Sequence, residues 1–128
     1  MKRWVGHGLG AGLLVAAFVC FGCQPAPPAG PPPEQVQVYV YYGPDVEPLH
    51  GIVTIPGRPT VLQVTRQVAP VATEITATGE EWVVGIDKRM ADVSAGTIWM
   101  YELNNEAPTT APNLTHVEPG DVIVWRLQ

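Results

Sequence analysis

The sequence predicts a small α+β domain in which one helix crosses one face of a mixed β-sheet. Three observations support this class. Apolar and polar residues alternate over 36–41, 97–103 and 122–127, as in strands with one buried face. One segment, 60–68, has helical spacing instead. No cysteine follows Cys23, so a hydrophobic core, without disulfides, must stabilise the domain.

The first two expected strands form a hairpin with a long connection. Val36, Val38 and Val40 share one side of the first strand. The Tyr-Gly-Pro-Asp segment at 42–45 interrupts this pattern, and extended structure resumes at 51–55.

The segment 60–68 contains β-branched residues that favour a strand, but its spacing favours a helix. The helical face would contain Val61, Val64, Thr65 and Val68. Thr60 followed by Gln63 has the form of a capping box, which marks a helix start. Pro70 marks the end of this helix.

The second half of the domain is expected to contain mostly strands. In the strand 97–103, Trp99, Tyr101 and Leu103 lie on one side. The remaining segments, in order, are one or two strands over 75–78 and 81–87, a loop over 88–96, a turn at Asn104-Asn105, a turn at 119–121 and a last strand over 122–127. A β-grasp arrangement is the simplest fold that fits this order.

The N-terminal residues resemble a bacterial lipoprotein signal. Lys2 and Arg3 precede an apolar stretch, 9–21, that is shorter than the roughly 20 residues of a membrane span. Gly22 is the small residue that a lipoprotein signal peptidase requires before Cys23. We therefore expect residues 1–22 to be a signal peptide and Cys23 to carry a lipid that anchors the exported protein to the membrane on the extracytoplasmic side. Ordinary secretion and an uncleaved amphiphilic anchor are the alternatives.

The segment 23–35 joins the expected lipid to the domain. Its proline-rich part, 24–33, favours an extended, semi-rigid spacer with a rise of about 3.1 Å per residue. The alternative is a ligand for a proline-binding module, although no basic anchor accompanies the prolines. The folded domain is expected over 36–128.

The charge of the chain argues against nucleic acid as a partner. After residue 22 the sequence contains five basic residues and twelve acidic ones, so its net charge is near minus seven. Binding of phosphates requires a basic face.

The sequence predicts no enzyme, because no residue pattern supports a catalytic site or a metal centre. His50 and His116 lie apart, without a neighbouring cysteine or a His-Glu-x-x-His pattern. Ser94 lies in a segment that lacks the nucleophile elbow of hydrolases. The acidic pairs Glu80-Glu81 and Asp87 with Asp92 are expected to be solvated.

Four segments resemble one known family, and they occur in the expected order. They are Pro-Thr-Val-Leu at 59–62, Val-Val-Gly-Ile-Asp at 83–87, Trp-Met-Tyr-Glu-Leu-Asn-Asn at 99–105, and Val-Glu-Pro-Gly-Asp-Val-Ile-Val-Trp at 117–125. Together they are similar to the transcobalamin-like C-terminal domain of bacterial surface proteins, the DUF4430 type. The family has an Asn-Gly turn where this sequence has Asn104-Asn105, and asparagine also tolerates a positive φ angle.

This resemblance implies a β-grasp fold and a role in binding, with Trp99, Tyr101 and Asn104 as the ligand contacts. A corrinoid such as cobalamin is the small ligand that the family suggests, although in the carriers it lies between two domains and this chain offers one. The ligand or partner is otherwise an unknown small molecule or a cell-surface protein. No other cofactor is implied.

The facing of the aromatic residues decides between an exposed patch and a core. If Tyr39, Tyr41, Trp99 and Tyr101 all faced away from the helix, they would form an exposed aromatic patch; otherwise most aromatic residues belong to the core. The alternative function is an assembly module at the cell surface that pairs through an exposed sheet edge, and inward packing of Trp99 and Tyr101 would favour it.

Overall fold

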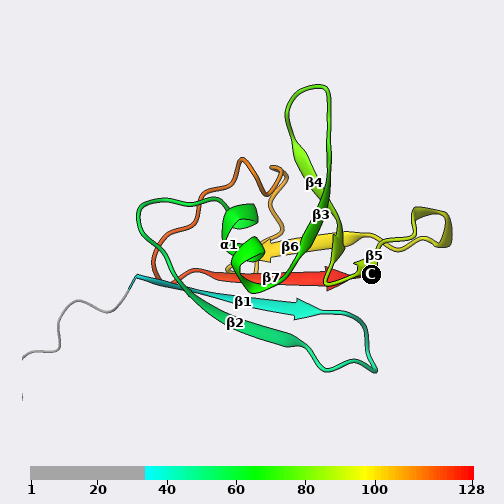
Figure 1. Cartoon of the computed structure of the whole chain (residues 1–128), viewed down its shortest axis with the longest axis horizontal. Helices are drawn as coiled ribbons and strands as arrows, with labels where there is room; N and C mark the ends of the chain where they lie inside the picture. The colour runs from blue at the N-terminus through cyan, green and yellow to red at the C-terminus, as the bar shows by residue number, and fades with distance from the viewer. Residues whose placement is uncertain (1–33) are drawn as a thin grey trace, which may run out of the picture. The chain divides into compact units, whose positions relative to one another are not determined.

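The first and last strands lie side by side at the centre of a four-stranded sheet (Figure 1). The computed structural model describes residues 34–128, so the predicted signal peptide, Cys23 and the proline-rich segment up to residue 33 lie outside the described residues. The elements are β1 (Gln35–Tyr41), β2 (Leu49–Thr54), α1 (Val61–Val68), β3 (Val71–Ile75), β4 (Glu81–Ile86), β5 (Arg89–Met90), the short 3₁₀ helix η1 (Val93–Ala95), β6 (Trp99–Leu103) and β7 (Val122–Leu127).

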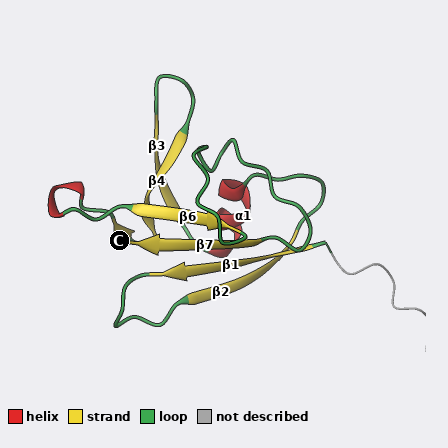
Figure 2. Cartoon of the chain, turned by 180° about the vertical axis from the view of Figure 1, so that it is seen from behind, coloured by secondary structure: helices red, strands yellow, loops and turns green. Residues whose placement is uncertain are grey.

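The four-stranded sheet has the order β2-β1-β7-β6 and is mixed. β1 pairs in parallel with β7, whereas β2 and β6 pair antiparallel with their neighbours. α1 covers one face of this sheet, and Figure 2 shows the opposite face without a covering element. The α+β class, with one helix on a mixed sheet in a β-grasp-like arrangement, is thereby confirmed.

The capping box predicted for α1 is present. The Thr60 hydroxyl accepts a hydrogen bond from the Gln63 main-chain N–H at 3.2 Å, and the Gln63 side chain accepts one from the Thr60 N–H at 2.9 Å. Val61, Leu62, Val64 and Thr65 are buried against the sheet. The helix prevails over the β-branched composition because this face packs on the sheet and its start is capped.

The core lies between α1 and the inner face of the four-stranded sheet. Val36, Val38 and Val40 of β1 are fully buried, as the alternation predicts. In β7 the buried residues Ile123 and Trp125 face the same layer. The buried side chains that are largest include Trp125, Ile55, Leu62 and Ile86.

A second, three-stranded sheet has the order β3-β4-β5. Figure 1 shows β3 and β4 rising as a hairpin from the four-stranded sheet. The two strands expected around a turn are present, and the chain turns at Gly79, whose φ is 85°. The bounds 75–78 of the first strand are wrong, because β3 ends at Ile75. The expected loop over 88–96 is wrong at its start, since Asp87 and Lys88 adopt positive φ angles and fold Arg89 and Met90 back onto β4 as β5.

The hypothesis of one exposed patch of four aromatic residues is wrong. Tyr101 pairs with Trp125 across the sheet, which directs Trp99 and Tyr101 toward the helix side, where both are buried. Tyr39 pairs with Val124 and faces the uncovered side instead. Tyr39 and Tyr41 therefore lie on one face of the sheet, and Trp99 and Tyr101 lie on the other.

The uncovered face carries paired polar and aromatic side chains. The rings of Tyr39 and His50 stack with centroids 4.2 Å apart. The Arg126 guanidinium lies 4.6 Å from the ring centroid of Tyr41.

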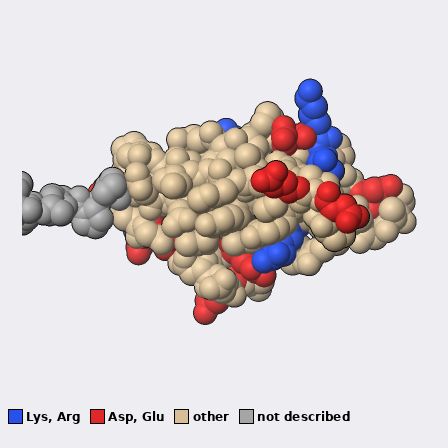
Figure 3. Space-filling model, turned by 90° about the horizontal axis from the view of Figure 1, so that it is seen from below, with Lys and Arg blue, Asp and Glu red and all other residues tan. Residues whose placement is uncertain are grey.

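In the view of Figure 3, from below, much of the visible surface is uncharged, and acidic side chains are more prominent than basic ones. No helix in residues 34–128 is both long and apolar enough to span a membrane.

Gly51 allows α1 to approach β2. A Cβ atom at this position would lie 2.7 Å and 2.8 Å from the two methyl carbons of Val68. We predict that Gly51→Ala destabilises the fold by about 1–3 kcal/mol through overpacking. Val68→Ala in the same chain should restore part of this loss, and urea unfolding of both single variants and the double variant measures the coupling. Additive effects of the two substitutions would contradict the proposed contact.

Candidate functional site

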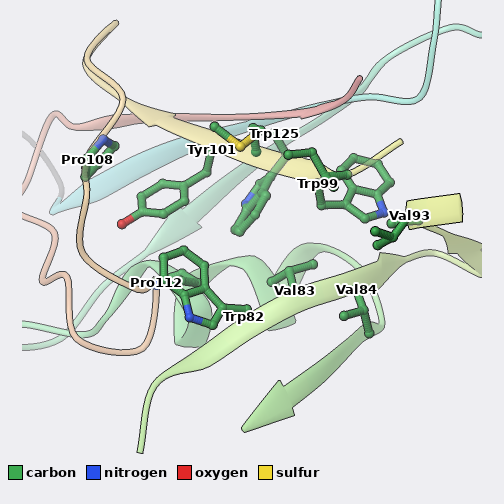
Figure 4. Close-up of a pocket in the computed structure, with 12 residues that line it drawn as sticks. Trp82, Val83, Val84, Val93, Trp99, Tyr101, Pro108, Pro112 and Trp125 are labelled. Carbon is green, nitrogen blue, oxygen red and sulfur yellow. The ribbon is translucent and has the colours of Figure 1, made fainter. Parts of the chain in front are cut away.

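A cleft of about 350 Å³ lies between the four-stranded sheet and β4 (Figure 4). Figure 4 shows Trp99, Tyr101 and Trp125 on one side of it and Trp82, Val83 and Pro112 on the other. The full lining consists of apolar or aromatic side chains: Trp82, Val83, Val84, Ala91, Val93, Ile98, Trp99, Met100, Tyr101, Pro108, Pro112 and Trp125. We call this site the aromatic cleft.

Trp125 positions the inner wall of the aromatic cleft. It lies on the central strand β7 with its side chain 1% exposed. Its indole N–H donates a hydrogen bond to the Thr65 hydroxyl at 2.9 Å, and that hydroxyl donates to the Val61 carbonyl at 2.8 Å. Tyr101 packs against it with ring centroids 5.2 Å apart. The wall is therefore held by both the sheet and the helix.

The polar atoms of Trp99 and Tyr101 also have partners within the chain. The Trp99 indole N–H donates to the main-chain carbonyl of Arg89 at 2.9 Å. The Tyr101 hydroxyl donates to the carbonyl of Thr110 at 2.5 Å and lies 2.8 Å from the hydroxyl of Thr115. These bonds connect β6 to β5 and to the loop before β7, and they fix the orientation of both rings.

The inner wall of the aromatic cleft therefore presents apolar ring surface rather than free hydrogen-bonding side chains. Within residues 34–128, no buried side-chain nitrogen or oxygen lacks a hydrogen-bond partner. A polar ligand group placed against these rings would lose its bonds to water without replacement, which is unfavourable. An apolar group would gain from leaving water.

The mouth of the aromatic cleft is apolar as well. Trp82 of β4, Ile98 and Met100 are about two-fifths exposed, at 38%, 43% and 40%. Val93, on η1, is 76% exposed. A group of exposed apolar side chains around a concave site is typical of a binding surface.

Burial changes the acidity of two tyrosines in and behind the cleft. It raises the pKa of Tyr101, and the hydrogen bond with Thr115 opposes this effect. Burial also raises the pKa of Tyr42, with a further contribution from the carboxylate of Asp87. Tyr42 contacts Trp99 edge to face at 6.0 Å, so both phenols belong to the packing that supports the cleft.

Trp99 and Tyr101, two of the three ligand contacts predicted from the sequence, line the aromatic cleft. Asn104 does not. It forms the turn after β6, where its side-chain amide donates to Asp121 at 2.9 Å and accepts from the Val122 N–H at 2.9 Å. The positive φ angles of Asn104 and Asn105, 52° and 66°, agree with the predicted turn.

The facing of Trp99 and Tyr101 does not separate the two functions considered from the sequence. Both side chains point inward, which was expected to favour an assembly module, yet they form a wall of an open cleft. Sequence reasoning missed Trp82 as a site residue. Its alternation with the buried Val83 indicates that the two side chains lie on opposite sides of β4, but it does not indicate that β6 lies nearby.

The residues considered for catalysis or metal binding lie in structural roles. The Ser94 hydroxyl donates to Asp92, and this bond, together with one from the Ala95 N–H, lowers the pKa of the Asp92 carboxyl at the start of η1. His116 contacts the Arg58 carbonyl at 2.8 Å. In the described range no three histidine, cysteine, aspartate or glutamate side chains are grouped as metal ligands.

The fold and the cleft define a small β-grasp-like domain with an aromatic cleft. Residues 59–128 match the family described as a domain of unknown function, DUF4430, and the chain belongs to this family. β1 and β2 precede the matched range but form half of the same sheet. No curated protein matches the chain in sequence.

Two solved structures share the fold. One is a protein from Ruminococcus gnavus ATCC 29149 for which metal binding has been suggested; it has 20% sequence identity and a TM-score of 0.62, and the match covers 74% of this chain and 96% of that one. The other is haptocorrin in complex with Cbi, with 16% identity and a TM-score of 0.61 over 73% of this chain. The chain matches only 25% of the length of haptocorrin.

The raised pKa values of Tyr101 and Tyr42 predict a loss of stability at alkaline pH. The folded state favours the neutral phenols, so the free energy of unfolding should be unaffected by these groups below the ordinary tyrosine pKa of 10.0 and should fall as the pH rises above it. Urea unfolding at a series of pH values measures this slope. Tyr101→Phe should reduce it while lowering stability at neutral pH by about 1 kcal/mol. An unchanged slope in Tyr101→Phe and Tyr42→Phe would contradict the assignment.

Proposed function

We propose that this protein is a non-enzymatic binding module whose aromatic cleft receives an apolar group of its ligand. The observation that carries this proposal is the concave surface formed by Trp82, Trp99, Tyr101 and Trp125, in which every polar side-chain atom of the inner wall is already bonded within the chain. Such a surface favours binding through the hydrophobic effect and ring contacts.

The size of the cleft limits what it binds. A volume of about 350 Å³ lies near the lower end of the range for ligand sites. A buried methylene group contributes about 0.8 kcal/mol, so a few apolar atoms supply useful affinity. The cleft suits a side chain, a ring or a short aliphatic segment of a ligand.

The likeness to haptocorrin makes a corrinoid the first defined compound to test, and the family resemblance supports the same choice. The rim of a corrinoid carries amide groups, for which the inner wall of the aromatic cleft offers no free side-chain partners. A corrinoid would therefore contact this domain through its apolar parts. Metal binding is less well supported, because the described residues offer no group of ligands.

The proposed setting of the module is the extracytoplasmic side of a membrane. Its support is the sequence of residues 1–35, in which a signal-like segment, the Gly22-Cys23 step and a proline-rich spacer precede β1. A lipid on Cys23 would hold the domain at the surface, and the spacer would separate the aromatic cleft from the lipid headgroups.

Binding of an apolar probe tests the cleft. We expect the full chain with Cys23→Ser, purified without detergent, to bind N-phenyl-1-naphthylamine with a rise in probe fluorescence. Trp82→Ala should weaken binding roughly tenfold, which corresponds to about 1.4 kcal/mol, because the exposed ring forms one wall. Ile52→Ala is the matched control, since Ile52 is exposed on the uncovered side of the sheet.

Equal weakening by Trp82→Ala and Ile52→Ala, or no binding by the parent chain, would contradict the proposal. Titration of the same three proteins with cobinamide, followed by tryptophan fluorescence, tests the corrinoid. Competition between cobinamide and the probe would assign the corrinoid to the cleft, and saturable binding without competition would assign it elsewhere.

Replacement of Cys23 by serine tests the tether. We predict that Cys23→Ser moves the protein from the membrane fraction to the soluble fraction without changing its unfolding midpoint, because the spacer separates the lipid from the domain. Fractionation followed by immunoblotting and urea unfolding provides the two measurements. Unchanged membrane association would rule out the lipid anchor.

A further inference from the structure

The strand β6 lies at the edge of the four-stranded sheet, and its main-chain groups alternate in direction. Ile98, just before the strand, exchanges two hydrogen bonds with Gln128 at 2.7 Å and 3.0 Å. In an antiparallel pair every second residue repeats this arrangement, so Met100 and Glu102 also point their main chain toward β7. The main chains of Trp99 and Tyr101 consequently point away from the sheet.

The outward main-chain groups of Trp99 and Tyr101 have no hydrogen-bond partner within the described part of the chain. The next outward residue, Leu103, differs, because it exchanges bonds with Glu106 at 2.8 Å and 3.1 Å. The edge is therefore closed at Leu103 and open at Trp99 and Tyr101. An open edge of this kind is a template for another strand.

The same two residues line the aromatic cleft with their side chains. A strand that added to the edge of β6 would continue the pleat of the sheet, with every second side chain on the face of Trp99 and Tyr101. Those side chains would enter the space between β6 and β4, where Trp82 forms the opposite wall (Figure 4). The edge and the cleft thus offer complementary parts of one site.

We propose that the natural ligand of the aromatic cleft is an extended peptide segment of a partner protein, which adds as a strand to β6 and places alternate apolar side chains in the cleft. This proposal rests on the proposed binding function. The described domain contains twelve acidic and five basic residues, so charge complementarity favours a neutral or basic segment. A ligand without a main chain would leave the donors and acceptors at the edge of β6 unused.

The opposite edge of the sheet provides an internal control. The Ile55 N–H donates to the Glu34 carbonyl of the neighbouring segment at 2.7 Å. Because every second residue of an antiparallel pair repeats this direction, Val53, Gly51 and Leu49 point their main chains toward β1, and His50 and Ile52 point theirs to the free edge. No residue of β2 lines the aromatic cleft. A peptide that required only an open edge would bind β2 as well as β6.

The experiment uses the ¹⁵N-labelled full chain with Cys23→Ser and a pool of short peptides in which threonine alternates with leucine, valine, phenylalanine or tryptophan between terminal lysines. Amide hydrogen exchange is measured by NMR with and without peptide. At a peptide concentration of about ten times Kd, exchange at Trp99 and Tyr101 should slow about tenfold, and exchange at His50 and Ile52 should not change. Trp82→Ala should reduce the protection.

A second measurement separates strand addition from burial of side chains alone. Peptides are N-methylated either at every apolar residue or at every threonine. If the peptide pairs with β6, one set of methyl groups blocks the bonds to the strand and abolishes binding, whereas the other set faces away and is tolerated. Equal effects of the two sets would overturn the proposal.

Two other results would overturn strand addition while the proposed function stands. In the first, peptides displace N-phenyl-1-naphthylamine without slowing exchange at Trp99 and Tyr101. In the second, no peptide of the pool binds although the probe binds in a manner that depends on Trp82. If the probe also fails to bind, the proposed function itself falls.

Discussion

The hydrogen bond between the Trp125 indole and the Thr65 hydroxyl is the contact on which the rest of the domain depends. Thr65 is the buried polar residue of α1, and its hydroxyl also donates to the helix main chain, so a single side chain satisfies the indole and fixes where α1 lies on the sheet. Removing the Thr65 hydroxyl would leave the buried indole N–H of Trp125 unsatisfied, whereas removing the indole would leave a hydroxyl that is still bonded to the Val61 carbonyl. Because Trp125 also forms part of the inner wall of the aromatic cleft, the packing of the core and the shape of the cleft have a common origin.

Main-chain carbonyls of β5 and of the loop before β7 orient the two β6 rings of the cleft. Arg89 and Thr110 accept hydrogen bonds from the two β6 rings through their carbonyl groups. The identity of either side chain is therefore less important for the cleft than the path of its backbone. The inner wall of the cleft is therefore apolar although its residues contain polar atoms, and the main-chain groups of Trp99 and Tyr101 on the edge of β6 have no partner in the described part of the chain. A ligand that uses both features has to combine apolar side chains with an extended main chain.

Local sequence patterns were sufficient for the strands of the main sheet and for the helix. Val36, Val38 and Val40 alternate with polar residues, and Thr60 with Gln63 marks the start of α1. The second sheet was predicted less well, because the β4–β5 connection depends on positive φ angles at both Asp87 and Lys88, and lysine gives no turn signal beside the aspartate. In the site, the family resemblance indicated Trp99 and Tyr101, and both line the cleft from β6. Trp82 lines the same cleft from β4, a strand that precedes β6 in the sequence without pairing with it, and Asn104 lies outside the cleft in the turn after β6, a position that asparagine favours.

The parallel pairing of β1 with β7 has a consequence for when the domain is able to fold. These strands are separated by nearly the whole described chain, yet Val40 and Trp125 are neighbours in the sheet. A nascent chain contains β1, β2 and α1 long before it contains the strand against which they pack. The core is therefore completed only after translation of β7, and folding depends on contacts between residues far apart in sequence. Until β7 is made, β1 and β6 lack the strand that joins them in the sheet.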